Sequence, residues 1–248
     1  MLAAALLALS AQGAATAATP EGIRDIVLVH GAFADGSSWS DVITRLQRRG
    51  YHVTAVQNPL TSLEDDVAAT QRVLQRQPGP VLLVGHSWGG AVVTQAGNAA
   101  NVRGLVYLSA LVPDGGESVV DLLQREQAPM EGLVPDAAGR VWLDDPAAYR
   151  QVMAGDVPPA RVALLAATQT PMTVGAFGQK VEAAAWRVKP SWYLVTENDR
   201  ALAPAVQRRI AAHIGAHTGS IASSHMSLVS RPAAVTEFIV QAAKEAGR

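Results

Sequence analysis

A serine flanked by glycines is the strongest candidate for chemistry in this sequence. Residues 85–89 read Gly-His-Ser-Trp-Gly, which is the pattern G-x-S-x-G. The apolar run 81–84 precedes this pattern and predicts a buried strand, and the small residues 90–96 that follow it predict a helix. A strand, a sharp turn and a helix in this order form a nucleophile elbow, which exposes Ser87 Oγ above the edge of a sheet. Glycines on both sides of the serine permit the close backbone contacts that such a turn requires.

A serine hydroxyl is a weak nucleophile at neutral pH and needs a general base. Around an elbow the order along the chain is serine, acid and then histidine, and only His213, His217 and His225 come late enough. His225 lies in a polar loop between the last expected strand and the last expected helix, at the edge of the sheet where ligands bind. We therefore predict His225 as the base. His213, at the end of a helix, and His217, just after it, are expected to have exposed structural roles.

The acid that orients the base is predicted to be Asp199. It occupies the turn after the expected strand 191–196, and it precedes His225 by 26 residues. Its alternative role is an ordinary turn aspartate, Glu197 is a candidate for a solvated neighbour, and Asp114 is the other position open to the acid. The acid is not expected to take the proton, because its role is to fix the imidazole tautomer and stabilise the imidazolium ion.

Backbone amides are predicted to stabilise the oxyanion that forms during acyl transfer. One donor is the amide of Trp88, directly after the serine. The second lies in the loop after the first strand, where Ala32 is our first choice and Phe33 our second. His30 and His86, beside these two turns, are expected to be structural.

Strands and helices must alternate to position these residues. The expected strands are residues 25–30, 51–56, 81–84, 102–108, 191–196 and 219–222. The expected helices cover residues 39–46, a stretch from Ser62, residues 90–96, residues 205–214 and a stretch from Ser230. This alternation predicts an α/β fold with a mostly parallel sheet of about six strands and helices on both faces.

The regular alternation stops between about residues 114 and 186. This stretch is rich in proline and short helical patterns, so we predict a helical cap insertion within a single domain of residues 20–248. Apolar residues of the insertion are candidates for lining an acyl pocket, although cap helices bury such residues in any case. They are Met130, Leu133, Val134, Trp142, Tyr149, Met153, Leu164, Leu165, Met172 and Phe177.

Composition excludes several classes of function. The 248 residues are 49% hydrophobic and 17% charged, carry a net charge of −1 and include no cysteine. Without a basic run, nucleic acid is not an expected partner. Thiolate catalysis and cysteine-ligated zinc are excluded, and no ligand spacing predicts a metal or another cofactor. No stretch after residue 20 is apolar enough to span a membrane, and the sequence gives no prediction of the oligomeric state.

The first 19 residues resemble a signal peptide. An apolar run from Leu2 to Leu9 is followed by small residues at positions 15 and 17, as at a signal peptidase site, although no Lys or Arg precedes the run. We expect export to the periplasm or medium, and a cytoplasmic protein if this leader is not functional.

The His-Gly-Ala loop at 30–32, the Gly-His-Ser-Trp-Gly-Gly turn, the Asp199 turn and His225 together resemble the α/β-hydrolase superfamily from residue 23 to the C-terminus. Within it the chain is similar to the small esterases that include plant methyl-ester esterases, hydroxynitrile lyases and bacterial relatives. The resemblance implies Ser87, Asp199 and His225 as a catalytic triad, with Ala32 and Trp88 as oxyanion donors. Many relatives have another residue in place of Trp88, so its indole is expected to reshape the pocket.

These features predict a cofactor-free serine hydrolase that cleaves small, moderately apolar carboxylic esters through an acyl-enzyme. One alternative is a hydroxynitrile lyase, but the resemblance implies that lyases have Thr in place of Gly31 and use a nearby Lys. This chain has only Lys180, Lys189 and Lys244, none in an expected catalytic turn. The other alternative is a non-catalytic small-molecule binding protein, which a broken triad would have favoured. Dehalogenases and epoxide hydrolases need Asp in place of Ser87.

Overall fold

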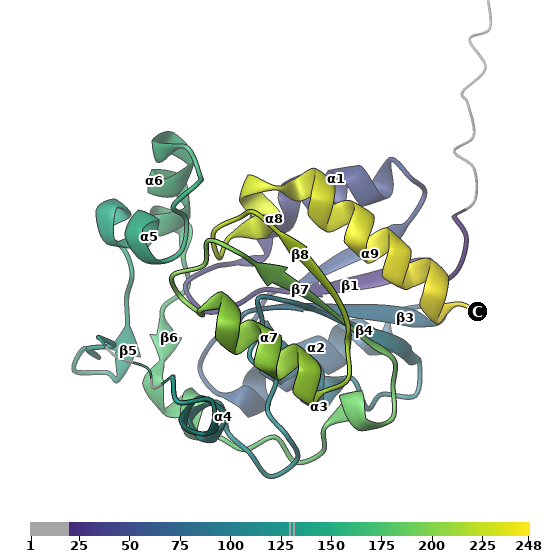
Figure 1. Cartoon of the computed structure of the whole chain (residues 1–248), viewed down its shortest axis with the longest axis horizontal. Coiled ribbons are helices and arrows are strands. Elements are labelled where there is room, and N and C mark those ends of the chain that lie inside the picture. The colour runs from purple at the N-terminus through teal and green to yellow at the C-terminus, as the bar shows by residue number, and fades with distance from the viewer. Residues whose placement is uncertain (1–19, 129, 131) are drawn as a thin grey trace, which may run out of the picture.

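A six-stranded parallel sheet forms the centre of the protein in a computed structural model, which describes residues 20–128, 130 and 132–248 (Figure 1). The predicted leader, residues 1–19, lies outside the described residues. The strand order is β2-β1-β3-β4-β7-β8, and every neighbouring pair is parallel. The strands are β1 (Asp25–Val29), β2 (His52–Val56), β3 (Val81–His86), β4 (Val102–Leu108), β7 (Ser191–Thr196) and β8 (His217–Ile221). The predicted fold class is thus confirmed.

The four inner strands carry the core. All residues of β1, β3 and β7 are buried, and Arg103 is the exception in β4. The edge strands β2 and β8 are largely half-buried or exposed. Central strands that are apolar on both faces are typical of a parallel sheet covered by helices, which is why these strands could be predicted from their composition.

Helices cover both faces of the sheet (Figure 1). One face packs against α1 (Ser40–Gln47), α8 (Ser227–Ser230) and α9 (Pro232–Ala246), and a 3₁₀ turn, η1 (Gly36–Trp39), leads into α1. The other face packs against α2 (Leu63–Gln75), α3 (Gly89–Ala96) and α7 (Pro204–His213). The helix expected from Ser230 onward is α9, which begins at Pro232 because proline favours the first turn of a helix, and the short helix α8 before it was not predicted.

The chain between β4 and β7, residues 109–190, is called the connecting segment below. It contains α4 (Val119–Arg125), α5 (Pro146–Val152), α6 (Pro159–Thr168) and the antiparallel pair β5 (Arg140–Val141) and β6 (Met172–Thr173). Two 3₁₀ turns, η2 (Val174–Gly178) and η3 (Ala185–Arg187), precede β7. In Figure 1, α5 and α6 lie beyond the carboxyl ends of the strands.

In the described part of the chain, no helix combines the length and the apolarity needed to cross a membrane.

Candidate active site

Ser87 occupies a strained turn between β3 and α3. Its φ is +52°, in the left-handed region that residues other than glycine seldom adopt. The neighbouring chain leaves no room for side chains at the flanking glycines. A Cβ on Gly85 would lie 2.6 Å from the carbonyl oxygen of Gly89, and a Cβ on Gly89 would lie 2.6 Å from that of Val29. These close contacts hold the turn, and hence the hydroxyl, in one conformation.

Two further strained residues follow neighbouring strands. Phe33, after β1, has a φ of +56°, and Ser109, after β4, has a φ of +40°. Together with Ser87 they mark the carboxyl edge of three adjacent strands. Strained backbone of this kind gathers at functional sites, because the surrounding fold must enforce it. The carboxyl edge of the sheet is therefore the candidate position of an active site.

His225 and Asp199 form a buried hydrogen-bonded pair. His225 Nδ1 lies 2.7 Å from Asp199 Oδ2, and the two side chains are 2% and 0% exposed. An ionised carboxylate can only accept hydrogen bonds, so the histidine donates from Nδ1. In the neutral imidazole, Nε2 is then the nitrogen with the free lone pair.

Asp199 is held ionised by a dense set of donors. Its Oδ1 accepts from the amides of Ala201 and Leu202, both at 2.8 Å. Its Oδ2 accepts from the Thr196 hydroxyl at 2.7 Å and from Gln207 Nε2 at 2.9 Å. Burial opposes the charge, but the imidazole of His225 and these hydrogen bonds outweigh it and lower the pKa of Asp199.

Two other side chains hold the backbone of His225. Its carbonyl accepts from His86 Nε2 at 3.0 Å and from the Ser109 hydroxyl at 3.3 Å. Burial and the nearby His225 ring lower the pKa of His86 to about 3, so its imidazole is neutral. As expected, His86 therefore supports the loop that carries His225.

The loop after β1 lies against the elbow. A Cβ on Gly31 would lie 2.7 Å from the Cβ of Ser87, so this loop passes directly over the serine. Burial lowers the pKa of His30, which donates from Nδ1 to the Gly31 carbonyl at 2.9 Å. On the other side, the Tyr149 hydroxyl of α5 donates to the Phe33 carbonyl at 3.0 Å. The loop is thus fixed from the sheet and from the connecting segment.

A pocket of about 570 Å³ brings most of the predicted residues together. Ser87 and His225 line it, as do Ala32, Phe33 and Trp88, the three candidate oxyanion donors. The rest of its wall is mainly apolar and comes largely from the connecting segment. We call this cavity the main pocket, and its shape suits a small apolar substrate.

Half of the apolar residues predicted for the pocket wall line the main pocket. They are Met130, Leu133, Trp142, Met153 and Phe177. Tyr149, Leu165 and Met172 are instead buried in the core, and Val134 and Leu164 are 81% and 49% exposed. As expected, amphipathic patterning alone did not separate pocket residues from residues that only stabilise the fold.

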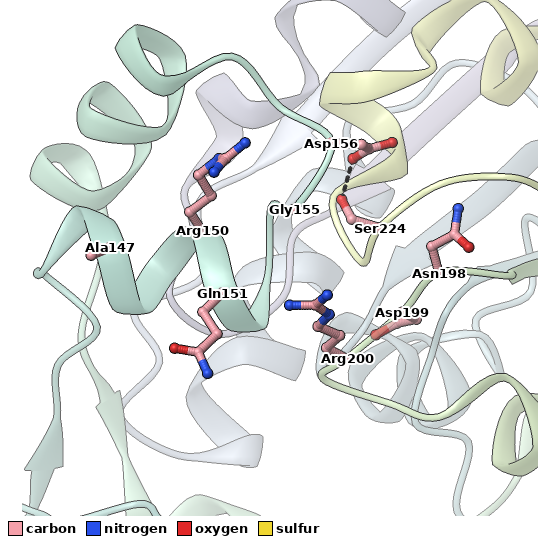
Figure 2. Close-up of a pocket in the computed structure, with 9 residues that line it drawn as sticks. All are labelled: Ala147, Arg150, Gln151, Gly155, Asp156, Asn198, Asp199, Arg200 and Ser224. Atoms are coloured by element: carbon pink, nitrogen blue, oxygen red, sulfur yellow. Dashed lines mark hydrogen bonds between the residues drawn. The ribbon is translucent and has the colours of Figure 1, made fainter.

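A second depression, of about 840 Å³, opens beside the turn that contains Asp199 (Figure 2). Its wall includes Asp199 and Ser224, whose hydroxyl donates to Asp156. Arg200 lines both this depression and the main pocket. The depression is larger than the main pocket, but Ser87 does not line it, so it reaches the turn that contains Asp199 without reaching Ser87.

The alternative candidates lie elsewhere. Asp114 forms an ion pair with Arg187 and accepts from the amide of Gly115. His213 lies 3.4 Å from the same carboxylate, at the end of α7. Glu197 pairs with Arg208 on the surface. His217 lies in the edge strand β8 and stacks on a tryptophan side chain of the neighbouring strand β7. None of these residues lines the main pocket.

Asp66 is a buried carboxylate that the sequence analysis did not single out. It lies in the first turn of α2 and is fully buried. Its Oδ2 accepts from Trp88 Nε1 at 2.7 Å, and its Oδ1 accepts from the amide of Leu60 at 2.8 Å. Burial raises the pKa of Asp66 to about 6, against the effect of these two hydrogen bonds. The run Glu-Asp-Asp in a first turn is ordinary for a helix, so nothing in the sequence distinguishes Asp66 from its neighbours.

The raised pKa of Asp66 predicts a pH-dependent cost to stability. The folded state holds the proton more tightly than the unfolded state, so ionisation between about pH 4 and pH 6 destabilises the native protein. A rise from 3.8 to about 6 corresponds to roughly 3 kcal/mol. We expect the free energy of unfolding of the wild type to fall by about this amount relative to Asp66→Asn between pH 4 and pH 7.

Urea denaturation of both proteins across this pH range measures the difference directly. The neighbouring, exposed Asp65 is the control, because hydrogen bonds from Thr61 and Ser62 lower its pKa. Its contribution to stability is present at neutral pH and lost as the pH falls, so Asp65→Asn has the opposite sign. A pH-independent difference between the wild type and Asp66→Asn would show that Asp66 has an ordinary pKa.

The fold and the geometry of this edge identify the protein as a member of the alpha/beta hydrolase family. The sequence model of that family matches residues 26–238, which confirms the predicted resemblance. The alpha/beta hydrolase nvfD of Aspergillus novofumigatus is 28% identical over 246 residues, covering 89% of this chain and 97% of that protein.

Other similar proteins have names that describe esterases or hydrolases. A carbendazim hydrolyzing esterase of Nocardioides is 31% identical over 121 residues, covering 43% of this chain and 50% of that protein. Putative methylesterase 12 of Arabidopsis thaliana is 24% identical, covering 76% and 62% respectively. Among solved structures, a pyrethroid hydrolase superposes with a TM-score of 0.73 at 24% identity, covering 88% of this chain and 96% of that one. At this identity the structural likeness establishes the fold alone.

Proposed function

We propose that this protein is a serine carboxylesterase that cleaves small, moderately apolar esters. One observation carries the proposal: Ser87 and His225 line the same apolar pocket, and His225 is hydrogen bonded at Nδ1 to the buried Asp199. Ser87, Asp199 and His225 also follow one another along the chain in the order serine, acid and histidine that an elbow hydrolase requires.

In the proposed reaction, His225 Nε2 takes the proton from Ser87 Oγ as the oxygen attacks the ester carbonyl. Asp199 remains ionised and stabilises the imidazolium that results. Amides of Trp88 and the loop of Ala32 and Phe33 stabilise the oxyanion of the tetrahedral intermediate. His225 then protonates the departing alcohol. In the second half of the reaction His225 takes a proton from water as the water attacks the acyl-enzyme, and it returns that proton to Ser87 Oγ as the carboxylic acid leaves.

The lysine positions argue against the lyase alternative. Lys189 donates to two backbone carbonyls beside β4, and Lys244 lies 3.6 Å from a glutamate near the start of β1. Neither these residues nor Lys180 is among the described residues that line the main pocket. The lack of space for a Cβ at Gly31 also disfavours a side chain at the position where lyases have Thr.

A fluorophosphonate probe tests the proposal directly. We expect one probe to attach per protein molecule, at Ser87, and esterase activity on p-nitrophenyl acetate to disappear in proportion to labelling. Intact-mass and peptide mass spectrometry measure the stoichiometry and the site. Ser109, the buried serine after β4, is an internal control because it does not line the main pocket.

Two outcomes would contradict the proposal. Labelling at another serine with parallel loss of activity would assign the nucleophile elsewhere. Tight binding of small apolar esters without turnover or labelling would instead support the binding-protein alternative.

A further inference from the structure

Asp66 is unusual because it is a fully buried carboxylate with no cationic partner among the described residues. Its two oxygens instead accept from one backbone amide and one indole. Burying an unpaired carboxylate costs stability, and an apolar residue would avoid that cost. The position of Asp66 therefore calls for a reason beyond folding.

One oxygen of Asp66 is linked to the connecting segment through Leu60. Leu60 is buried and has a φ of +56°, and its amide donates to Asp66 at 2.8 Å. Its carbonyl accepts from the amide of Thr173 in β6 at 3.0 Å. Asp66 thus stabilises a strained residue to which one strand of the connecting segment is bonded.

The other oxygen of Asp66 is linked to the connecting segment through Trp88. The Trp88 indole is fully buried, and its ring meets the ring of Phe177 edge to face, with centroids 5.2 Å apart. Phe177 lies in η2 and is 4% exposed, and both Trp88 and Phe177 line the main pocket. The two links from Asp66 therefore reach adjacent stretches of the connecting segment, β6 and η2.

We propose that Asp66 is a positioning residue that holds the Trp88 indole against Phe177, and that this fixed indole limits the size of the apolar group that the main pocket admits. The proposal rests on the proposed esterase activity and adds a specificity determinant to it. The substrate class it implies is esters with compact apolar groups, because a wall held in place by this buried indole would not give way to a longer chain.

Two contacts restrict the movement of the Trp88 indole. The hydrogen bond at 2.7 Å fixes the direction of the ring, and edge-to-face packing on Phe177 fixes its plane. Loss of the N–H or of the carboxylate removes the first restraint and leaves the second. A smaller or rotated ring then opens space next to the catalytic serine, and each added methylene that fits there is worth roughly tenfold in discrimination.

The chain contains a matched control for this pair. Trp192 in β7 donates from Nε1 to Glu245 Oε2, also at 2.7 Å, near the end of α9. Neither residue lines the main pocket. The substitutions Trp192→Phe and Glu245→Met therefore remove the same kind of hydrogen bond from a place remote from the serine.

The experiment measures kcat/KM for two ester series, one with acyl groups from C2 to C12 on p-nitrophenol and one with alcohols of increasing size on acetate. The proteins are the wild type, Trp88→Phe, Asp66→Leu, their double variant and the two control variants; leucine has the branched shape of aspartate but no oxygen that could accept from the indole. For each protein the result is the ratio between long and short substrates. This ratio does not depend on the fraction of correctly folded enzyme, so a merely structural role for Asp66 would leave it unchanged.

We expect Trp88→Phe and Asp66→Leu each to raise the long-to-short ratio about tenfold in at least one series. The double variant should match Trp88→Phe within about twofold, because Asp66 acts through the indole. The control variants should keep the ratio of the wild type. Unchanged ratios in both single variants, or full additivity in the double variant, would overturn the proposal. Failure of the esterase activity itself would appear differently, as a wild type with no serine-dependent turnover of any ester.

Discussion

Alanine at position 87 is expected to lower kcat for p-nitrophenyl acetate by roughly 10⁴- to 10⁶-fold. The loss follows from removal of the oxygen that forms the acyl-enzyme, since Ser87 has the one hydroxyl among the described residues that line the main pocket. Residual turnover above the background rate would come from the oxyanion donors and from His225 acting on water. Steady-state and burst kinetics with active-site titration give this number.

The turn itself should survive the substitution. Alanine tolerates the left-handed φ of +52° no worse than serine, so we expect the melting temperature and the circular dichroism spectrum of Ser87→Ala to match the wild type. Ser191→Ala, which removes a buried hydroxyl at the amino end of β7, where it donates to the carbonyl of Lys189, is the control. Turnover by Ser87→Ala within tenfold of the wild type would rule out Ser87 as the nucleophile.

The second large effect is expected from Asp199→Asn, with kcat lower by about 10³- to 10⁴-fold. The NH₂ group of asparagine cannot accept a hydrogen bond from Nδ1–H of His225. The imidazole therefore loses the restraint that leaves Nε2 free to act as base. The lost negative charge also destabilises the imidazolium that forms in the reaction. Measurement of kcat from pH 5 to pH 10 separates the effects, because the lost charge alone shifts the ascending limb of the profile.

Glu197→Gln is the matched control, since it neutralises a carboxylate two residues away that pairs with Arg208 on the surface. It should retain kcat within about twofold. The double variant Ser87→Ala/Asp199→Asn should have a kcat only a little lower than that of Ser87→Ala alone, because the effects of residues that act as a unit are not additive. A kcat for Asp199→Asn near that of the wild type would transfer the role of the acid to another residue.

The sheet could be predicted from the sequence because its inner strands are apolar along their whole length. The turn containing Ser87 was equally plain, because the glycines on both sides of it have steric roles that no other residue can fill. His225 and Asp199 can be predicted as base and acid because each follows a strand, and the structure brings them within hydrogen-bond distance. These predictions depend on local patterns and on chain order, both of which a sequence displays.

Residues that act through distant partners could not be predicted. Gln207 donates to Asp199 from inside α7, where a glutamine reads as an ordinary helix residue. Asp66 reads as a first-turn acid, and its contact with Trp88 spans 22 residues. Such contacts depend on how helices are placed against the sheet, which composition and periodicity do not encode.

The connecting segment leaves the sheet from β4 and returns to it in β7, and these two strands are direct neighbours. Its ends are therefore held side by side by the ladder between the strands, whatever lies between them. Since the entropy of closing a loop grows only slowly with its length, this segment can be lengthened, shortened or exchanged at little cost to the sheet. Ser87, Asp199 and His225 all lie outside this segment, whereas much of the wall of the main pocket lies within it, which makes residues 109–190 a natural target for grafting in enzyme engineering.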